Sequence, residues 1–473
     1  MSDTHDEATT TSRAPTHHQR TSSVASPIRV GQAGQTTPTT LTAAFAATSA
    51  IRFLAPDLFS ELRLQIPRLE WDVPADIALH LGGRQQIHDV TVAFLRLTRP
   101  WMPVVSGKRH LAAVLNPLLA PLQRPRALLT LCMKLCCLSV DDRIRNEGRH
   151  PLYLLVKQIY AEVERVEEPC LEVMQAALFI AVFEMGDAIY PAAHLTVGAL
   201  IRYGIAMGMD KINLDRMGAG AAAGATAGAS WLDIEEMRRV WWGALILDRL
   251  LNVSHPSWSL ASADPVFEDF LPVDDESFHN ATSTPEDATR ISEAFGFKLG
   301  SYAPLSPSSD AVQLCRTLEA LVRANEFEVT TRKLAFCSQS TISYIGVLLL
   351  QEHHWEETSL DFTPGAKRNA FTETHSALET LDRISMRMRG AGHGGQRDLE
   401  SGHCTPFFVD LVYRALSALM VIGRGQDATD MQDKKESLKW LLSHTRKRWP
   451  LVGVYEKILA VKEAMAVAEA ASG

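Results

Sequence analysis

Two clusters of acidic residues are the first places in this chain where chemistry could occur. Asp141-Asp142 follows an apolar stretch, and Asp274-Asp275-Glu276 follows the segment 271–273. Clustered carboxylates hold Mg²⁺, and an all-α enzyme can use such ions to bind a diphosphate. The first cluster has no third acid at the required spacing, and no N-D-x-x-S-x-x-x-E sequence supplies a second set of ligands. These acids therefore do not by themselves predict a metal-dependent enzyme.

Histidine residues offer few further sites. His353 and Glu356 could share one face of a helix, but the two-turn H-E-x-x-H arrangement of a zinc hydrolase is absent. His393, His403 and Cys404 lie in or beside a glycine-rich loop, which lacks the rigidity that a site needs. No G-x-S-x-G turn, phosphate-binding glycine loop or dinucleotide fingerprint occurs. We predict no catalytic residue, no metal site and no cofactor.

The seven cysteines are odd in number and scattered, which does not fit a disulfide framework. Cys132, Cys136 and Cys137 fall within the apolar stretch 126–140, where cysteine behaves as a small apolar residue. No second Cys or His pair stands nearby, so burial is favoured over metal binding. No cysteine precedes Cys132. The pattern favours a reducing, intracellular compartment.

The composition is that of an ordinary globular protein. At 473 residues with 46% hydrophobic side chains, the chain can bury one large core or a few smaller ones. Its net charge of −8 argues against binding nucleic acid through the bulk of the protein. The longest apolar runs, 240–247 and 342–350, are well short of the ~20 residues that span a bilayer. We expect no membrane association and no secretory signal.

Helices must position these residues, because apolar side chains recur at helical spacing from residue 41 onward. Residues 1–40 are rich in Ser, Thr, Pro, Gln and His and are expected to form a disordered tail. The sequence predicts an all-α fold, with one large domain over 41–473 and a flexible Ala/Gly insertion at 217–229. The expected helices include residues 126–140, 170–185, 194–209, 235–251, 311–335, 338–352, 369–389, 407–423 and 455–471.

The segment 235–251 is the most distinctive of the predicted helices. Asp233 is expected to cap it, with Glu236 reaching back to complete a capping box. Trp241 lies on an apolar stripe, and Trp242 covers part of the remaining surface. We therefore expect the middle of this helix to be buried almost all round.

Asp248 lies on the same stripe as Trp241. A buried carboxylate is costly unless it is paired or hydrogen-bonded, so we expect a cationic or hydroxyl partner on a neighbouring helix. Arg202 and Tyr203 are the nearest candidates in sequence. Three arginines of the same segment could neutralise acids elsewhere: Arg238, Arg239 and Arg249. We interpret these residues as structural rather than catalytic.

The segment 235–251 resembles the signature helix of the fungal-specific transcription factor domain, the regulatory region that usually follows a zinc binuclear cluster. Residues 199–210 resemble the preceding helix of that family, with Arg202, Ala206, Gly208 and Met209 at the corresponding positions. Residues 271–275 resemble its closing D-x-x-L-P element, although the usual Gly-Arg pair is absent from the loop before it. The resemblance covers residues 171–275.

This resemblance implies an all-α transcription regulator in the nucleus, one that controls a fungal secondary-metabolite (biosynthetic or toxin) gene cluster. The residues that carry the signature are Arg202, Arg238, Arg239, Trp241, Trp242, Asp248 and Arg249. Because no cysteine precedes Cys132, the zinc cluster through which the family reads DNA is missing from this sequence. We therefore expect a protein partner to supply DNA binding, either in a dimer or in another assembly, rather than this chain itself.

A short basic run, Arg446, Lys447 and Arg448, ends one of the predicted helical regions. Such a run can direct nuclear import, or it can be solvated or matched to the helix dipole. Two other functions stay open at this point. One is an all-α enzyme of the terpene synthase type, and the other is a helical ligand-sensing or scaffold protein with a pocket near Trp241 and Trp242.

Overall fold

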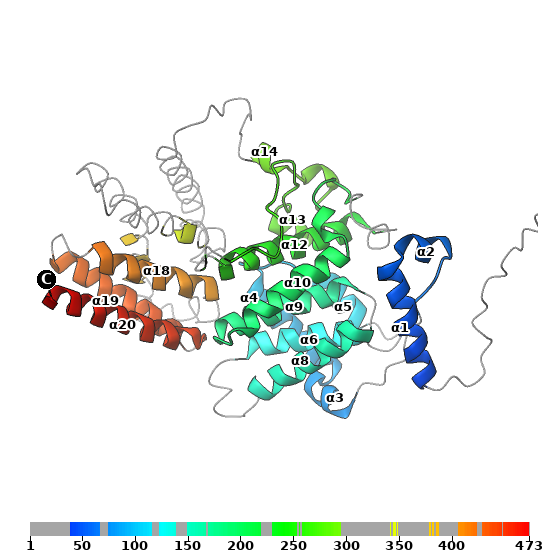
Figure 1. Cartoon of the computed structure of the whole chain (residues 1–473), viewed down its shortest axis with the longest axis horizontal. Helices are drawn as coiled ribbons and strands as arrows, with labels where there is room; N and C mark the ends of the chain where they lie inside the picture. The colour runs from blue at the N-terminus through cyan, green and yellow to red at the C-terminus, as the bar shows by residue number, and fades with distance from the viewer. Residues whose placement is uncertain are drawn as a thin grey trace, which may run out of the picture. The chain divides into compact units, whose positions relative to one another are not determined.

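The described part of the chain is helical. The computed structural model describes residues 38–66, 74–115, 123–138, 149–166, 169–218, 229–252, 255, 258–294, 405–422, 428–446 and 448–472, with short stretches between 341 and 386 (Figure 1). Within these residues the extended structure is an isolated antiparallel bridge between Phe270 and Arg290. The prediction of an all-α fold is confirmed.

The chain divides into two compact units, residues 1–69 and 70–473. In the first unit, α1 (Pro38–Leu54) packs against the short α2 (Pro56–Glu61). Helix α1 begins inside the segment 1–40 that was predicted to be a tail, and the rest of that segment lies outside the described residues. The single domain over 41–473 stays a prediction.

The second unit contains the other described helices. They are α3 (Ala75–Leu81), α4 (Arg84–Thr98), α5 (Gly107–Leu115), α6 (Arg124–Cys137), α8 (Arg149–Val166), α9 (Leu171–Gly186), α10 (Ala192–Ala206), η1 (Met209–Lys211), α12 (Trp231–Asn252), α13 (Asp275–Asn280), η2 (Pro285–Asp287), α14 (Ile291–Ala294), α18 (Pro406–Ile422), α19 (Ala428–Thr445) and α20 (Leu451–Ser472). The helices predicted at 126–140, 170–185, 194–209 and 235–251 correspond to α6, α9, α10 and α12. None of the described helices combines the length and apolar character that a membrane crossing requires.

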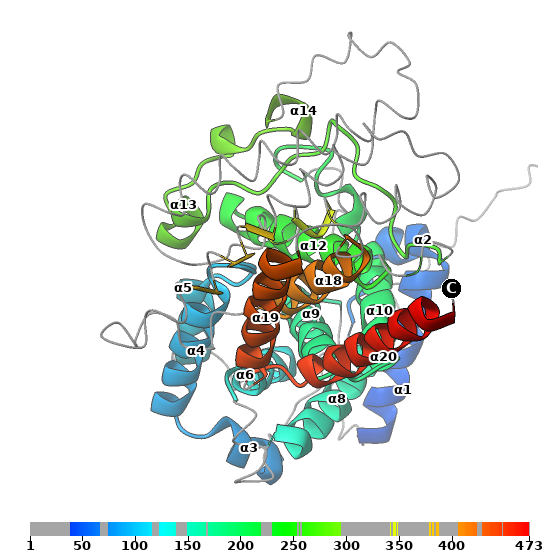
Figure 2. The ribbon, with the colours of Figure 1, turned by 90° about the vertical axis from the view of Figure 1, so that its left-hand side faces the viewer.

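Helix α9 is the centre of the larger core. Every residue from Val173 to Gly186 is buried, because the sequence of this helix is apolar on nearly all sides. It contacts α6, α8, α10 and α12, which surround it in Figures 1 and 2. Its buried Glu184 accepts a hydrogen bond from the Tyr153 hydroxyl at 2.8 Å and pairs with Lys157 Nζ at 3.0 Å. One oxygen of this carboxylate is thus satisfied by two side chains of the neighbouring α8.

Helices α10 and α12 approach closely at Gly204. A Cβ atom added to Gly204 would lie 2.8 Å from the Trp241 ring and 2.9 Å from the Met174 methyl group. The same addition at Gly198, two turns earlier in α10, would meet nothing within 4 Å. The large Trp241 ring can therefore pack in the core because one residue on the facing helix has no side chain.

The C-terminal helices form a second core. Helices α18, α19 and α20 contact one another around buried residues that include Leu416, Leu441 and Val452. Helix α18 corresponds to the prediction at 407–423, and α20 begins at Leu451 rather than at residue 455. Helix α19 was not predicted as a separate helix. The predictions at 311–335, 338–352 and 369–389 lie wholly or largely outside the described residues, as does most of the insertion 217–229.

Candidate functional site

Helix α12 carries a set of charged residues that lie inside the protein and bond to the surrounding loops. We call this set the α12 hub; it consists of Glu235, Glu236, Arg238, Arg239, Asp248 and Arg249. All but Arg249 are less than 9% exposed. Between the two charged ends, Trp241 is buried and the half-buried Trp242 donates its indole N–H to the Phe270 carbonyl at 3.0 Å. The predicted burial of the middle of this helix is confirmed.

The helix starts one turn earlier than predicted. The Asp233 amide donates to Ser230 Oγ at 3.3 Å, and the Ser230 amide donates to Asp233 Oδ2 at 2.8 Å. This reciprocal pair is a capping box built on Ser230, with Asp233 in the third helical position. The prediction that Asp233 caps the helix and Glu236 reaches back was therefore wrong. Glu236 lies further inside and is free to bond across the core.

Glu235 and Arg239 fasten the loop that precedes α13. Glu235 Oε1 accepts hydrogen bonds from Arg239 Nε and from the Val273 amide, both at 2.9 Å. Arg239 also donates to Asp275 Oδ1 at 2.6 Å and to the Val273 carbonyl. Burial raises the pKa of Glu235, while the charge of Arg239 acts in the opposite direction. The guanidinium is planar and lies 4.2 Å from the Phe278 ring, an arrangement that a lysine could not reproduce.

Arg238 fastens the loop that follows η1. Its side chain is 0% exposed and donates to the Asp215 carbonyl at 3.3 Å and to the Arg216 carbonyl at 2.9 Å. Its third partner is Glu235, at 3.2 Å. A fully buried arginine is tolerated because a carboxylate and two carbonyl oxygens replace its hydration. Arg238 thus joins the loop between η1 and α12 to the start of α12.

Glu236 connects α12 to the segment before α5. It accepts hydrogen bonds from the Ser106 amide and from Gln175 Nε2, both at 2.8 Å, and pairs with Arg109. Gln175 in turn donates to the Val104 carbonyl at 2.8 Å. Burial raises the pKa of Glu236, and the charge of Arg109 opposes this shift. The carboxylate thereby joins three separate elements to α12.

Asp248 and Arg249 hold the loop that follows α12. Asp248 is 1% exposed, which confirms the prediction of a buried acid. It accepts from the Ser262 hydroxyl at 2.7 Å, from the Ser262 amide at 3.0 Å and from the Ala261 amide at 3.2 Å. Arg249 donates to the Ala263 carbonyl at 2.8 Å and pairs with Asp264 at 2.9 Å. At this end of the hub the partners of both residues lie in a loop rather than in a helix.

The hydroxyl partner predicted for Asp248 is present, but it is Ser262 in a loop, so the neighbouring helix and the two named candidates, Arg202 and Tyr203, were wrong. Arg202 is exposed, and the hydroxyl of Tyr203 accepts from the Cys170 amide at 3.0 Å.

The described residues of the basic run at 446–448 differ in their exposure. Arg448 is 6% exposed and donates to the Leu138 carbonyl at 2.7 Å, so it cannot form part of an exposed basic patch. Arg446 is exposed and pairs with Glu456, whereas Lys447 lies outside the described residues.

The acidic cluster at 274–276 has structural contacts. Asp274 caps α13 by accepting from the Ser277 amide at 3.0 Å, and this hydrogen bond holds the pKa of Asp274 below its usual value. Its neighbour Asp275 pairs with Arg239. Asp141, Asp142, His353, Glu356, His393, His403 and Cys404 lie outside the described residues. Within the part of the chain that is described, no group of three His, Cys, Asp or Glu side chains could hold a metal ion.

The cysteines of α6 are packed as apolar side chains. Cys132 and Cys136 are 1% and 8% exposed. Burial raises the pKa of Cys136 to about 12 and that of the partly buried Cys137 to about 11. Metal ligation and nucleophilic attack both require the thiolate, which such surroundings disfavour. These thiols are therefore suited to packing.

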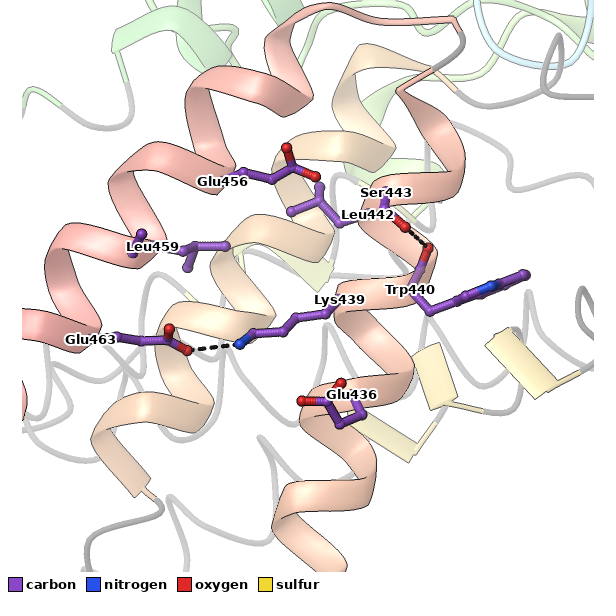
Figure 3. Close-up of a pocket in the computed structure, with 9 residues that line it drawn as sticks. Glu436, Lys439, Trp440, Leu442, Ser443, Glu456, Leu459 and Glu463 are labelled. Carbon is purple, nitrogen blue, oxygen red and sulfur yellow. Dashed lines mark hydrogen bonds and ion pairs between the residues drawn. The ribbon is translucent and has the colours of Figure 1, made fainter.

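The described part of the second unit contains hollows, of which two are notable. One, of about 150 Å³, lies between the end of α12 and the helices α18 and α20; Leu251, Asp410 and Tyr455 line part of it. The other is an open groove of about 710 Å³ between α19 and α20, in which Lys439 pairs with Glu463 beside Trp440 (Figure 3). Neither Trp241 nor Trp242 lines either hollow, so neither is the pocket that was considered near these tryptophans.

Comparison with known proteins identifies the class to which this helical protein with a buried charged hub belongs. Residues 121–344 match the fungal specific transcription factor domain, a range that includes the whole of α12. The transcription factor BOA15 of Botryotinia fuckeliana (strain B05.10) is 38% identical over 144 residues, which make up 30% of this chain and 74% of that protein. The chain is a transcription regulator. It belongs to the fungal specific transcription factor domain family.

Proposed function

We propose that this regulator acts in the nucleus on the genes of one secondary-metabolite or toxin pathway, and that it reaches them through a partner that binds DNA. The observation that carries the proposal is the α12 hub, because four of its residues (Arg238, Arg239, Asp248 and Arg249) are among those in which the chain resembles the signature helix of the family. The resemblance to this family implies the control of one biosynthetic gene cluster. In this proposal the residues from 41 onward form the regulatory domain, and the hub keeps its loops in place.

The proposal of a partner is supported by the described cysteines and by charge. Cys132 and Cys136 of α6 are buried, and burial raises their thiol pKa values. The net charge of −8 does not favour broad contact with a phosphate backbone. A partner that carries its own DNA-reading module would supply both the sequence specificity and the phosphate contacts.

The experiment that tests this function compares transcripts in the native fungus with and without the gene. We expect the transcripts of one group of biosynthetic genes to change together, and reintroduction of the wild-type chain to restore them. A fluorescent fusion should be concentrated in the nucleus. Unchanged transcripts, or a fusion excluded from the nucleus, would show that the chain does not have this role.

A further inference from the structure

Helix α20 presents an apolar face to solvent. Between residues 454 and 468 the exposed side chains are apolar except for two lysines. Five of them are large: Val454, Ile458, Val461, Met465 and Val467 are 42%, 37%, 58%, 58% and 70% exposed. The outer face of a surface helix normally carries charged and polar residues. The outer face of α20 is instead typical of a helix with a further element packed on it.

A second face of the same helix is already in use. Leu451, Val452 and Leu459 are buried in the second core, where α20 packs on α18 and α19. The helix is therefore apolar on two sides, of which its own bundle covers one. Figures 1 and 2 show α20, in red, beside α18 and α19.

Four of the large exposed residues have the spacing of a helix-packing seam. Val454, Ile458, Val461 and Met465 are separated by four, three and four residues. This alternation places them in one row along the helix, and it is the spacing with which two helices interlock side chains. The shape of this face therefore fits a second helix better than a loop or a strand.

The charges beside the seam are positive. At about 100° per residue, Lys457 and Lys462 fall on opposite sides of the row. Lys462 bonds to the Ser417 hydroxyl at 3.2 Å, and no described carboxylate pairs with either lysine. The described acids of α20, Glu456 and Glu463, are engaged elsewhere. Glu463 pairs with Lys439 at 3.0 Å across the α19–α20 groove (Figure 3), and Glu456 pairs with Arg446.

We propose that the seam of α20 docks an amphipathic helix of a partner protein, one whose own apolar row is flanked by Asp or Glu side chains. The acids of such a helix would lie opposite Lys457 and Lys462. A second copy of α20 is a poorer occupant: in a parallel pair, Lys457 of one copy would face Lys462 of the other. No carboxylate lies on this face between residues 454 and 468 to compensate for them. This inference goes beyond the proposed function and does not depend on which protein contacts DNA.

The test uses the full chain and two synthetic helical peptides of about 20 residues with Leu at four-three spacing. One peptide has Glu beside the apolar row and its twin has Lys. We expect fluorescence anisotropy to show that the chain binds the Glu peptide and not the Lys peptide. In the double variant K457E/K462E the preference should reverse, with affinity for the Glu peptide lowered about tenfold or more.

Two single variants locate the site. Val461→Glu, in the middle of the seam, should abolish binding of the Glu peptide, whereas Val266→Glu, at a loop residue that is 51% exposed, should leave it unchanged. Binding of both peptides equally, or of neither, would overturn the proposal. So would a dimer of the chain, measured by light scattering, that Val461→Glu dissociates, because a second copy would then be the occupant. Binding to phosphatidylserine vesicles that Val461→Glu abolishes, without peptide binding, would also overturn it.

Discussion

Ser262 satisfies the buried carboxylate of Asp248 with two donors, its hydroxyl at 2.7 Å and its backbone amide at 3.0 Å. The pair joins the last turns of α12 to the loop that follows it. Because both donors come from one residue, the position of this short stretch of backbone is fixed relative to the helix. The same principle applies at the other end of the hub, where Glu235 accepts from the Val273 amide.

Replacing Asp248 with Ala should therefore destabilise the protein. The amides of Ala261 and Ser262 would lose their acceptor, which we expect to cost about 2 kcal/mol in the free energy of unfolding. The matched control is Asp264→Ala, since the Asp264 side chain is 83% exposed and its pairing with Arg249 is solvated. Urea denaturation measures both variants. Equal effects of the two substitutions would contradict the role assigned to Asp248.

The contact between Gly204 and Trp241 predicts that alanine substitutions at Gly204 and Gly198, both in α10, change the stability in opposite directions. Gly204→Ala would force the Trp241 ring to move and should cost about 1–3 kcal/mol. Gly198→Ala meets no atom within 4 Å and should be neutral or stabilise by up to about 1 kcal/mol, because alanine favours the helix. Thermal unfolding of the two variants measures the difference. A melting temperature for Gly204→Ala at or above that of the wild type would show that α10 and α12 are not so closely packed.

His110 should make the stability depend on pH in the acid range. Burial lowers its pKa from 6.5 to about 4, with the charge of Arg126 acting in the same direction. As the pH falls, the unfolded chain therefore takes up this proton before the folded protein does. The stability that His110 contributes is fully present above pH 6.5 and is lost as the pH falls toward 4. Between pH 7 and 5 the wild type should lose about 2 kcal/mol that the His110→Asn variant does not lose. Identical pH profiles in urea denaturation would refute the assignment.

The buried cysteines should be chemically silent in the folded protein. Cys132 and Cys136 should resist iodoacetamide until denaturant is added, because burial raises their pKa values well above neutrality. A cysteine placed at Leu195, which is 69% exposed, is the control and should react at once. Mass spectrometry of the labelled peptides distinguishes the sites. Rapid labelling of Cys132 in the native protein would contradict its burial, which is one of the observations that support a partner for DNA binding.

The sequence predicted the elements that depend on local pattern. The apolar periodicity placed α6, α9, α10 and α12 close to their observed positions, and an acid inside an apolar stripe marked Asp248 as a buried group that needs partners. Helix α19 was missed because its first half is strongly charged and the buried apolar residues described for it, such as Leu438 and Leu441, lie in the second half. Periodicity is a weak signal when few residues of a helix enter the core.

The partners in the hub could not be predicted in the same way. Asp248 and Glu236 bond in part to the backbone amides of Ser262 and Ser106, and nearly every residue has such an amide, so the sequence does not distinguish these partners. Arg202, a cation of a neighbouring helix, was a candidate partner for Asp248 but is exposed. The capping box was misplaced because Ser230 and Asp233 are each followed, three residues later, by an acidic residue, so both fit the pattern. Such choices depend on the tertiary structure, which local spacing does not encode.

The central claim is that this regulator reaches DNA through a partner. The most direct test measures the binding of the purified full chain to promoter fragments that the tagged chain occupies in the cell, with and without the DNA-binding protein that co-purifies with it. We predict no discrimination between these fragments and scrambled ones by the chain alone, and specific binding once the partner is added. Sequence-specific binding by the chain alone would contradict the account.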